Sequence, residues 1–193
     1  MITGAGVRCV LRVVAARFER PGLVPLGPFD VALEAGARRT LRFPDARSAA
    51  IAARICAAIV KPTEGAVFVG DYDARLQPAQ AKRLVGFVPS GGFTGGGREF
   101  RREARMRADV WEISRRALEA RLDEAAEDAA SDPLVRALRL ALLPPVSLLV
   151  FERAAAVDSF AVRRLCAGAA VLAVETERDV ATPSSPEPAW ASR

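Results

Sequence analysis

The chain of 193 residues contains no histidine, two lysines and three cysteines, and each shortage excludes a class of site. Without histidine there is no Ser-His-Asp triad, no histidine general base and no histidine-based zinc site. Cys9, Cys56 and Cys166 have no metal-like spacing, and an odd number does not make a disulfide framework. We expect the cysteines to be small core residues.

Long apolar runs are also missing. No stretch approaches the roughly 18 residues of a membrane span, and the N-terminus lacks the charged-then-apolar pattern of a secretory signal. We therefore expect a cytoplasmic protein. A hydrophobic content of 51% over this length suits one α/β domain. The net charge is +5, but nearly all basic residues are arginine, which indicates compositional bias more than selection for a polyanion.

The most informative stretch is residues 41–70, which reads as strand end, loop, helix, turn and strand. We expect residues 39–43 to form a short strand that ends before Pro44. Residues 49–60 are rich in helix formers, and Pro62 would close that helix. Gly65 then opens a β-branched run that ends at a Gly-Asp turn, as expected for a second strand.

The order of these pieces resembles an ATP-binding cassette (ABC) domain, in which G-P-x-G-x-G-K-S-T opens a helix and R-P-x-x-G follows it. Counting back from residues 61–65, KPTEG, places the phosphate-binding P-loop at residues 43–51. The resemblance implies an α/β, P-loop NTPase-like ABC ATPase domain over residues 1–182. It would have a mixed central sheet flanked by helices and a small helical subdomain at about residues 98–143. Residues 183–193 are a Pro/Ser-rich tail that we expect to be disordered.

The residues at the P-loop positions do not suit phosphate binding, which needs close backbone approach, a lysine and a hydroxyl. The positions concerned are Phe43, Asp45, Arg47, Ser48, Ala49 and Ala50. Phe43 and Ser48 replace loop glycines, and Ala49 replaces the lysine. Asp45 adds a carboxylate that Arg47 would only partly offset. We expect no cofactor and no metal.

Other cassette motifs are matched by position and altered in chemistry. Residues 83–89, RLVGFVP, resemble the strand before the Q-loop, and Ser90 replaces its glutamine. Residues 147–158 align with the Walker B and D-loop pattern, with Phe151 at the metal-holding aspartate, Glu152 at the catalytic base and Asp158 at the D-loop acid. Glu152 is either a vestigial base or a strand-end carboxylate.

Towards the C-terminus the same alteration continues. Glu177 replaces the switch histidine. The signature position holds Ser131, Asp132 and Pro133, which predict a helix N-cap at Ser131 instead. We also expect residues 162–166 to continue a helix and residues 169–174 to form a buried strand.

Two further features leave alternatives open. By resemblance Phe18 would stack on adenine, but we favour its interpretation as a core or strand-end phenylalanine. Residues 98–128 have a charged helical pattern, which predicts a solvated, salt-bridged helix face. The resemblance makes it the subdomain that docks on a membrane subunit, and its arginines with Phe100 and Trp111 could instead meet nucleic-acid phosphates.

The resemblance thus predicts a pseudo-ATPase: a non-hydrolytic scaffold or regulatory partner of an ABC transport system. Its partner would be an ABC membrane subunit or an active cassette, so it would reach the inner face of the cell membrane only through a permease. The first alternative is an ABC ATPase that binds ATP and magnesium atypically, with Arg47 on phosphate and Phe18 on adenine. The second, which we favour less, is an arginine-rich nucleic-acid-binding protein.

Overall fold

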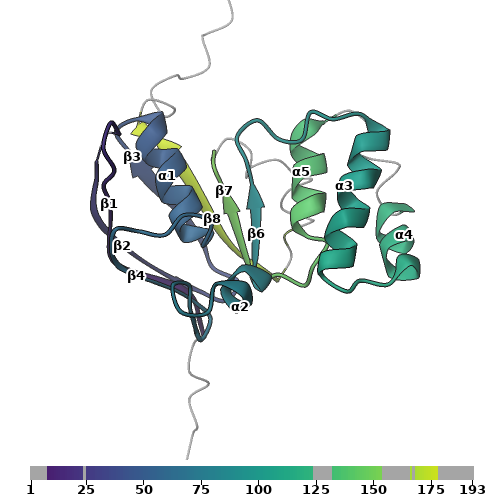
Figure 1. Cartoon of the computed structure of the whole chain (residues 1–193), viewed down its shortest axis with the longest axis horizontal. Coiled ribbons are helices and arrows are strands. Elements are labelled where there is room, and N and C mark those ends of the chain that lie inside the picture. The colour runs from purple at the N-terminus through teal and green to yellow at the C-terminus, as the bar shows by residue number, and fades with distance from the viewer. Residues whose placement is uncertain (1–7, 24, 124–131, 154–165, 167, 178–193) are drawn as a thin grey trace, which may run out of the picture.

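A computed structural model describes residues 8–23, 25–123, 132–153, 166 and 168–177 (Figure 1). Ser131, Asp158, most of the helix predicted for residues 162–166 and the tail at residues 183–193 lie outside this described part. Among the described residues, none of the helices combines the length and the apolar character that a membrane span requires.

Four strands form an antiparallel sheet in the order β2-β1-β4-β5. They are β1 (Cys9–Phe18), β2 (Leu26–Glu34), β4 (Glu64–Val69) and β5 (Tyr72–Asp73). In the central strand, Val13 pairs with Val31 on one side and with Val67 on the other. The register of β1 shifts just beyond Val13. Ala15, with φ 45°, donates its N–H there to Asp30 Oδ1 at 2.8 Å, so a bulge bends the strand.

The other four strands form a parallel sheet in the order β3-β8-β7-β6. They are β3 (Arg38–Phe43), β8 (Ala170–Thr176), β7 (Leu148–Phe151) and β6 (Val85–Val88). Every residue of β7 and β8 is buried, which explains why both strands are almost continuously apolar.

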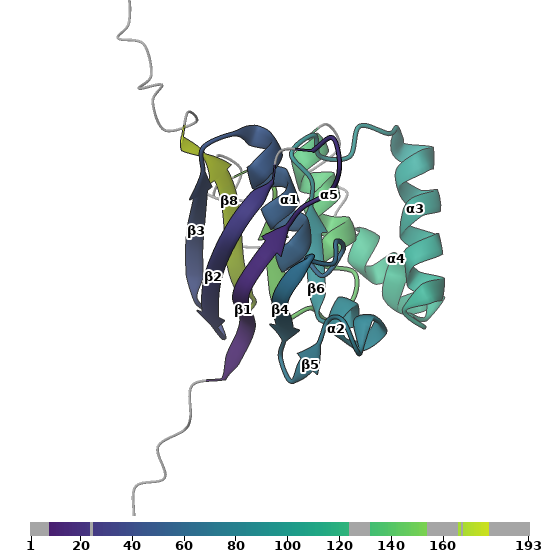
Figure 2. The same cartoon turned by 60° about the vertical axis from the view of Figure 1, so that its left-hand side comes forward.

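Helix α1 (Ala46–Cys56) lies between the two sheets (Figures 1 and 2). Ala49, Ala52 and Ala53 are buried, and their small side chains let the helix approach both sheets. Residues of α1, the antiparallel sheet and one face of β7 and β8 share a single core cluster. The alanine-rich helix α1 therefore forms a layer between the antiparallel sheet and the parallel sheet.

The remaining helices are α2 (Pro78–Arg83), α3 (Gly97–Val110), α4 (Arg115–Asp123) and α5 (Pro133–Ala141). Helix α5 packs on the other face of the parallel sheet, where a Cβ at Gly86 would lie 2.6 Å from the Ala141 carbonyl oxygen. Helices α3, α4 and α5 share a small core of their own that includes Ala104, Leu118 and Leu140. The predicted α/β class with flanking helices is confirmed, and the strands expected in one mixed central sheet form one antiparallel and one parallel sheet.

The predicted ends of α1 and the predicted cap of α5 are wrong. Helix α1 begins at Ala46 because Asp45 caps it, and ends at Cys56, well before Pro62. Within the described part of residues 98–128, the helical pattern is divided into α3 and α4 by a turn at Glu112, with φ 53°. The N-cap of α5 is Asp132, whose side chain accepts the Leu134 N–H, so the cap lies one residue later than predicted.

The end of α1 has a definite cause. The Ala58 N–H donates to the Ile55 carbonyl and the Ile59 N–H donates to the Arg54 carbonyl, both at 2.9 Å. This is the hydrogen-bond pattern of a Schellman motif, which needs one residue in the left-handed region. Ala58 is that residue, with φ 55°, although glycine is the usual choice there.

Candidate functional site at the carboxyl edge of the parallel sheet

Only Pro44 and Asp45 separate β3 from α1. Asp45 has extended backbone angles, and its carbonyl accepts the first helical bond, from the Ala49 N–H at 3.0 Å. Ala46, Arg47 and Ser48, which align with a phosphate-binding loop, therefore form the first turn of the helix. The loop between the strand and the helix is therefore only two residues long.

The Asp45 carboxylate binds the N-terminus of α1. Its Oδ1 accepts the N–H groups of Arg47 and Ser48, both at 2.9 Å, and its Oδ2 accepts the Ser48 hydroxyl at 2.6 Å. These bonds, that of the Ser48 side chain above all, hold the pKa of Asp45 below its ordinary value. The positive end of the helix dipole is thus already neutralised by a carboxylate of the same chain.

The other P-loop positions surround this cap without making an anion site. Ser48 and Ala49 are buried, Ala50 is half-buried and Arg47 is exposed. Phe43 packs edge to face on Phe29, with 5.6 Å between ring centroids. The structure therefore brings these side chains together around the strand-to-helix turn, with Phe43 directed to β2.

Phe18 lies at the end of β1 and is only 4% exposed. The Arg20 guanidinium carbon lies 5.2 Å from the centroid of its ring. The core cluster and Arg20 therefore already contact the ring that the resemblance would place on adenine.

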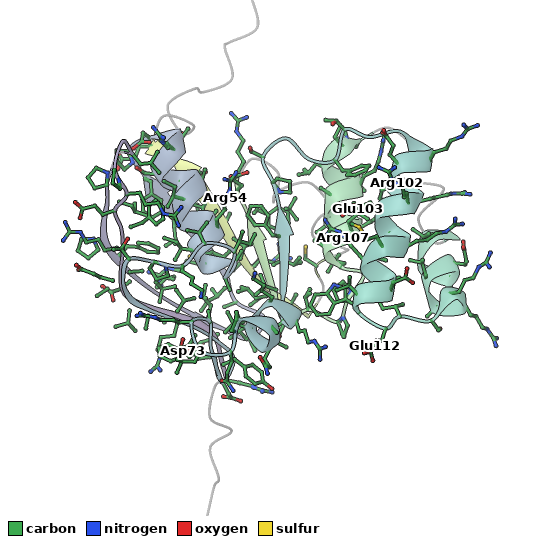
Figure 3. The ribbon with its side chains drawn as sticks, in the orientation of Figure 1. Arg54, Asp73, Arg102, Glu103, Arg107 and Glu112 are labelled. Atoms are coloured by element: carbon green, nitrogen blue, oxygen red, sulfur yellow. The ribbon has the colours of Figure 1, made fainter. Side chains whose placement is uncertain are left out.

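Glu152, directly after β7, contacts three donor groups of two residues, Ser90 in the loop after β6 and Arg54 in α1. Its Oε2 accepts the Ser90 N–H at 3.0 Å and the Ser90 hydroxyl at 3.3 Å, and its Oε1 lies 3.2 Å from Arg54 Nη2. Arg54 comes from α1, on the side facing β7 (Figure 3). The Glu152 side chain is 7% exposed, so the positions aligned with the catalytic base and the Q-loop are joined in one hydrogen-bonded cluster.

The neighbouring strand ends show similar pairing. Glu175 of β8 is buried, and its Oε1 accepts from Arg42 Nε at 2.8 Å. Phe151, at the Walker B aspartate position, is fully buried. Glu177, at the switch-histidine position, is exposed. The carboxylates of Asp45, Glu152 and Glu175 thus each have a partner from this chain.

Sequence reasoning missed Arg54 and Arg42. Arg54 is the only charged residue among residues 49–60, and a lone charge in an apolar helix was a usable signal for a buried partner. Arg42 offered no such signal, because its partner is distant in sequence and is set by the register of β3 on β8.

Cys56 and Cys166 have buried thiols. Burial raises the pKa of the Cys56 thiol to about 12 and that of Cys166 to about 11, so neither is an activated nucleophile. The described residues hold no group of three or more histidine, cysteine, aspartate or glutamate side chains that could bind a metal ion.

No protein-family model matches the sequence, and no curated protein does either. Solved structures do match. The structure is similar to the ATP-binding subunit of an ABC transporter, with a TM-score of 0.61 and 14% identity, over 86% of this chain and 79% of the other. The fold is that of an ABC ATPase.

Two further ABC structures agree. The part of the ABC transporter complex cbiONQ called cbiO1, from Clostridium perfringens, matches with a TM-score of 0.61 and 12% identity, over 87% of this chain and 79% of that one. A bacterial Atm1-family ABC exporter with ATP bound matches with a TM-score of 0.63 and 14% identity, over 91% of this chain and 35% of the exporter. Identities this low establish the ABC ATPase fold alone.

Proposed function

We propose that this chain is a non-hydrolytic, ABC-type subunit that serves as a scaffold or regulatory partner of an ABC transport system. The observation that carries the proposal is the Asp45 carboxylate on the Arg47 and Ser48 amides. A P-loop fold binds phosphate with amides at this helix end. Here a carboxylate of the protein takes their hydrogen bonds.

Electrostatics support the proposal. A phosphate oxygen about 4 Å from the Asp45 carboxylate would be repelled by roughly 4 kcal/mol per unit charge at an effective dielectric constant near 20. Glu152, the residue aligned with the catalytic base, is tied to Arg54 and Ser90. The apolar Phe151 stands at the metal position. These residues do not fit ATP with magnesium, and we assign no hydrolytic step to them.

The proposed contact surface for a partner is the outer face of α3. Met106 and Val110 are 55% and 67% exposed, and one helical turn separates them. Arg102, one turn before Met106 on the same face, is exposed as well and projects from α3 in Figure 3. A row of one arginine and two exposed apolar side chains suits a protein interface better than open solvent.

The nucleotide part of the proposal is tested with the purified protein and Mg-ATP. We expect no hydrolysis above background and no shift of the melting temperature. A ligand at a hundredfold excess over its Kd would add about 2.7 kcal/mol to the free energy of unfolding, so binding would be visible. ATP hydrolysis that Glu152→Gln abolishes would disprove the proposal.

The partner part is tested by crosslinking in cells with a photoreactive amino acid at position 106. We expect a crosslink to a multi-span permease or an active cassette of an ABC system. Leu76 is the matched control, because it is 78% exposed but lies between β5 and α2. Equal crosslinking from both positions, or none from position 106, would contradict the assignment of α3.

A further inference from the structure

Strand β3 lies at one end of the parallel sheet and pairs only with β8 in the part of the chain that the structure describes. The Val171 N–H donates to the Ala37 carbonyl at 2.9 Å, so the residue before β3 faces β8. Because backbone groups alternate along a strand, Arg39, Leu41 and Phe43 face β8 as well. The N–H and C=O groups of Arg38, Thr40 and Arg42 point to the open edge.

The open edge is exposed and basic. Arg38, Arg39, Thr40 and Arg42 are all exposed, and β3 lies on the outer side of the molecule in Figure 2. Side chains also alternate between the faces. Arg38, Thr40 and Arg42 share the face on which Arg42 meets Glu175, while Leu41 and Phe43 lie half-buried on the other, against the main core. The edge thus has a basic face and a second face on which the apolar Leu41 and Phe43 follow Arg39.

We propose that β3 binds an extended acidic segment of another protein, which adds as a further strand to the parallel sheet. Its backbone would pair with the outward groups of Arg38, Thr40 and Arg42, as in strand addition to an exposed sheet edge. Acidic side chains at alternate positions would lie opposite Arg38 and Arg42. Apolar side chains between them would cover Leu41 and Phe43. The matching pattern is an alternation of acidic and β-branched residues.

Charge argues against a second copy of this chain as the occupant. Two β3 strands edge to edge would place Arg38 and Arg42 against the same arginines of the other copy, and like charges opposite one another destabilise a strand pair. Strand β2 is an edge strand as well, and its Ala32 carbonyl already accepts a hydrogen bond from Arg39 Nη1 at 3.1 Å. The basic edge of β3 therefore favours an acidic partner over self-association.

Amide hydrogen exchange, followed by NMR on the full chain, tests whether the edge is free. We expect fast exchange at Arg38, Thr40 and Arg42 and slow exchange at Arg39, Leu41 and Phe43. Slow exchange at Thr40 in the monomer would mean that another part of this chain covers the edge. Slow exchange that appears only at high protein concentration would mean that a second copy does. Either result would overturn the proposal.

Fluorescence anisotropy then tests the partner's chemistry. The probe is a labelled peptide that alternates glutamate with valine, and its control replaces every glutamate with lysine. We expect the glutamate peptide to bind at least about tenfold more tightly, and its affinity to fall as salt is added. It should also slow exchange at Thr40. Equal affinity of the two peptides would overturn the proposal.

Variants of the protein separate backbone pairing from charge. Thr40→Pro removes an outward N–H and leaves the β3–β8 ladder intact, so we expect at least about tenfold weaker peptide binding with an unchanged circular dichroism spectrum. Arg38→Glu should weaken binding of the glutamate peptide by a similar factor and is the readout if Thr40→Pro does not fold. Arg75→Glu, at an exposed site after β5, is the matched charge control. Equal losses in Arg38→Glu and Arg75→Glu would overturn the proposal.

Discussion

Arg54 Nη2 and Glu152 Oε1 lie 3.2 Å apart, and this ion pair connects α1 to the end of β7. The Arg54 side chain is half exposed, whereas that of Glu152 is 7% exposed and also accepts two hydrogen bonds from Ser90. Because the carboxylate has left bulk water, its partners determine whether the charge is tolerated. We therefore expect this ion pair to stabilise the packing of α1 on the parallel sheet.

We expect Arg54→Met to lower the free energy of unfolding by about 1–3 kcal/mol, since Glu152 keeps its charge but loses its cation. Glu152→Gln should cost less in the Arg54→Met background than in the wild type. Urea unfolding of both single variants and the double variant gives the coupling, which we expect to be on the order of 1 kcal/mol.

The control for this cycle is the ion pair of Arg8 and Asp71, at 3.4 Å, whose side chains are 75% and 85% exposed. Its coupling should lie within about 0.5 kcal/mol of zero. Equal couplings for the two pairs would contradict the structural role of Arg54 and Glu152.

Asp45 should stabilise α1 in a pH-dependent manner. We expect Asp45→Ala to cost about 0.5–2 kcal/mol at neutral pH, the usual range for a lost N-cap. The folded state lowers the pKa of Asp45 from 3.8, so the charge-dependent part is fully present above pH 3.8. It is lost as the pH falls through the lower, folded-state pKa.

Asp45→Asn isolates that part, because asparagine also caps helices but carries no charge. Urea unfolding at neutral and acidic pH should show a stability gap between wild type and Asp45→Asn that narrows on acidification. A gap that widens in acid would show that the sign is wrong.

Ala58→Gly should stabilise the protein. Ala58 has φ 55°, a left-handed conformation that costs a residue with a Cβ roughly 1–2 kcal/mol, and the Schellman motif requires that conformation. We expect a net gain of about 0.5–1 kcal/mol, because glycine also loses more backbone entropy on folding. Ala57→Gly is the control: Ala57 has φ −81° and is buried, so its replacement should destabilise. Thermal unfolding measures both, and equal signs would contradict this explanation.

Gly65→Ala should be strongly destabilising. Gly65 has φ 81°, and a Cβ there would collide with the carbonyl groups of Val14 and Ala15 in the bulge of β1. Gly36 has φ 73° with open space around the same position, so Gly36→Ala carries the conformational cost without the collision. We expect Gly36→Ala to cost about 1 kcal/mol and Gly65→Ala clearly more. Similar values for the two would argue against close contact between β1 and β4.

Periodicity was enough to predict most strands and the existence of the middle helix, because apolar alternation and helix formers act locally. It failed at the ends of that helix. The sequence indicates only that Asp45 adds a carboxylate at the P-loop positions, whereas its side chain caps the helix and moves the start to Ala46. Ala58 gave no stop signal, since alanine rarely adopts a left-handed conformation.

The candidate site was predicted less completely than the fold. The resemblance placed Ser90 and Glu152 at related positions, and they do lie together. Arg54 and Arg42 supply the cations that pair with Glu152 and Glu175, and these pairs form only because α1 packs near β7 and β3 pairs with β8. Such long-range pairing leaves almost no trace in local sequence.

The early start of α1 has a consequence for any attempt to engineer nucleotide affinity into this chain. A lysine in place of Ala49 and a threonine in place of Ala50 would lie on a helix whose first turn, Ala46 to Ser48, is already formed and capped by Asp45. A triphosphate could reach the backbone amides only if this first turn unwound and the Asp45 carboxylate left them. Glycines at 46 and 48, together with removal of the acid, are therefore prerequisites for such a redesign.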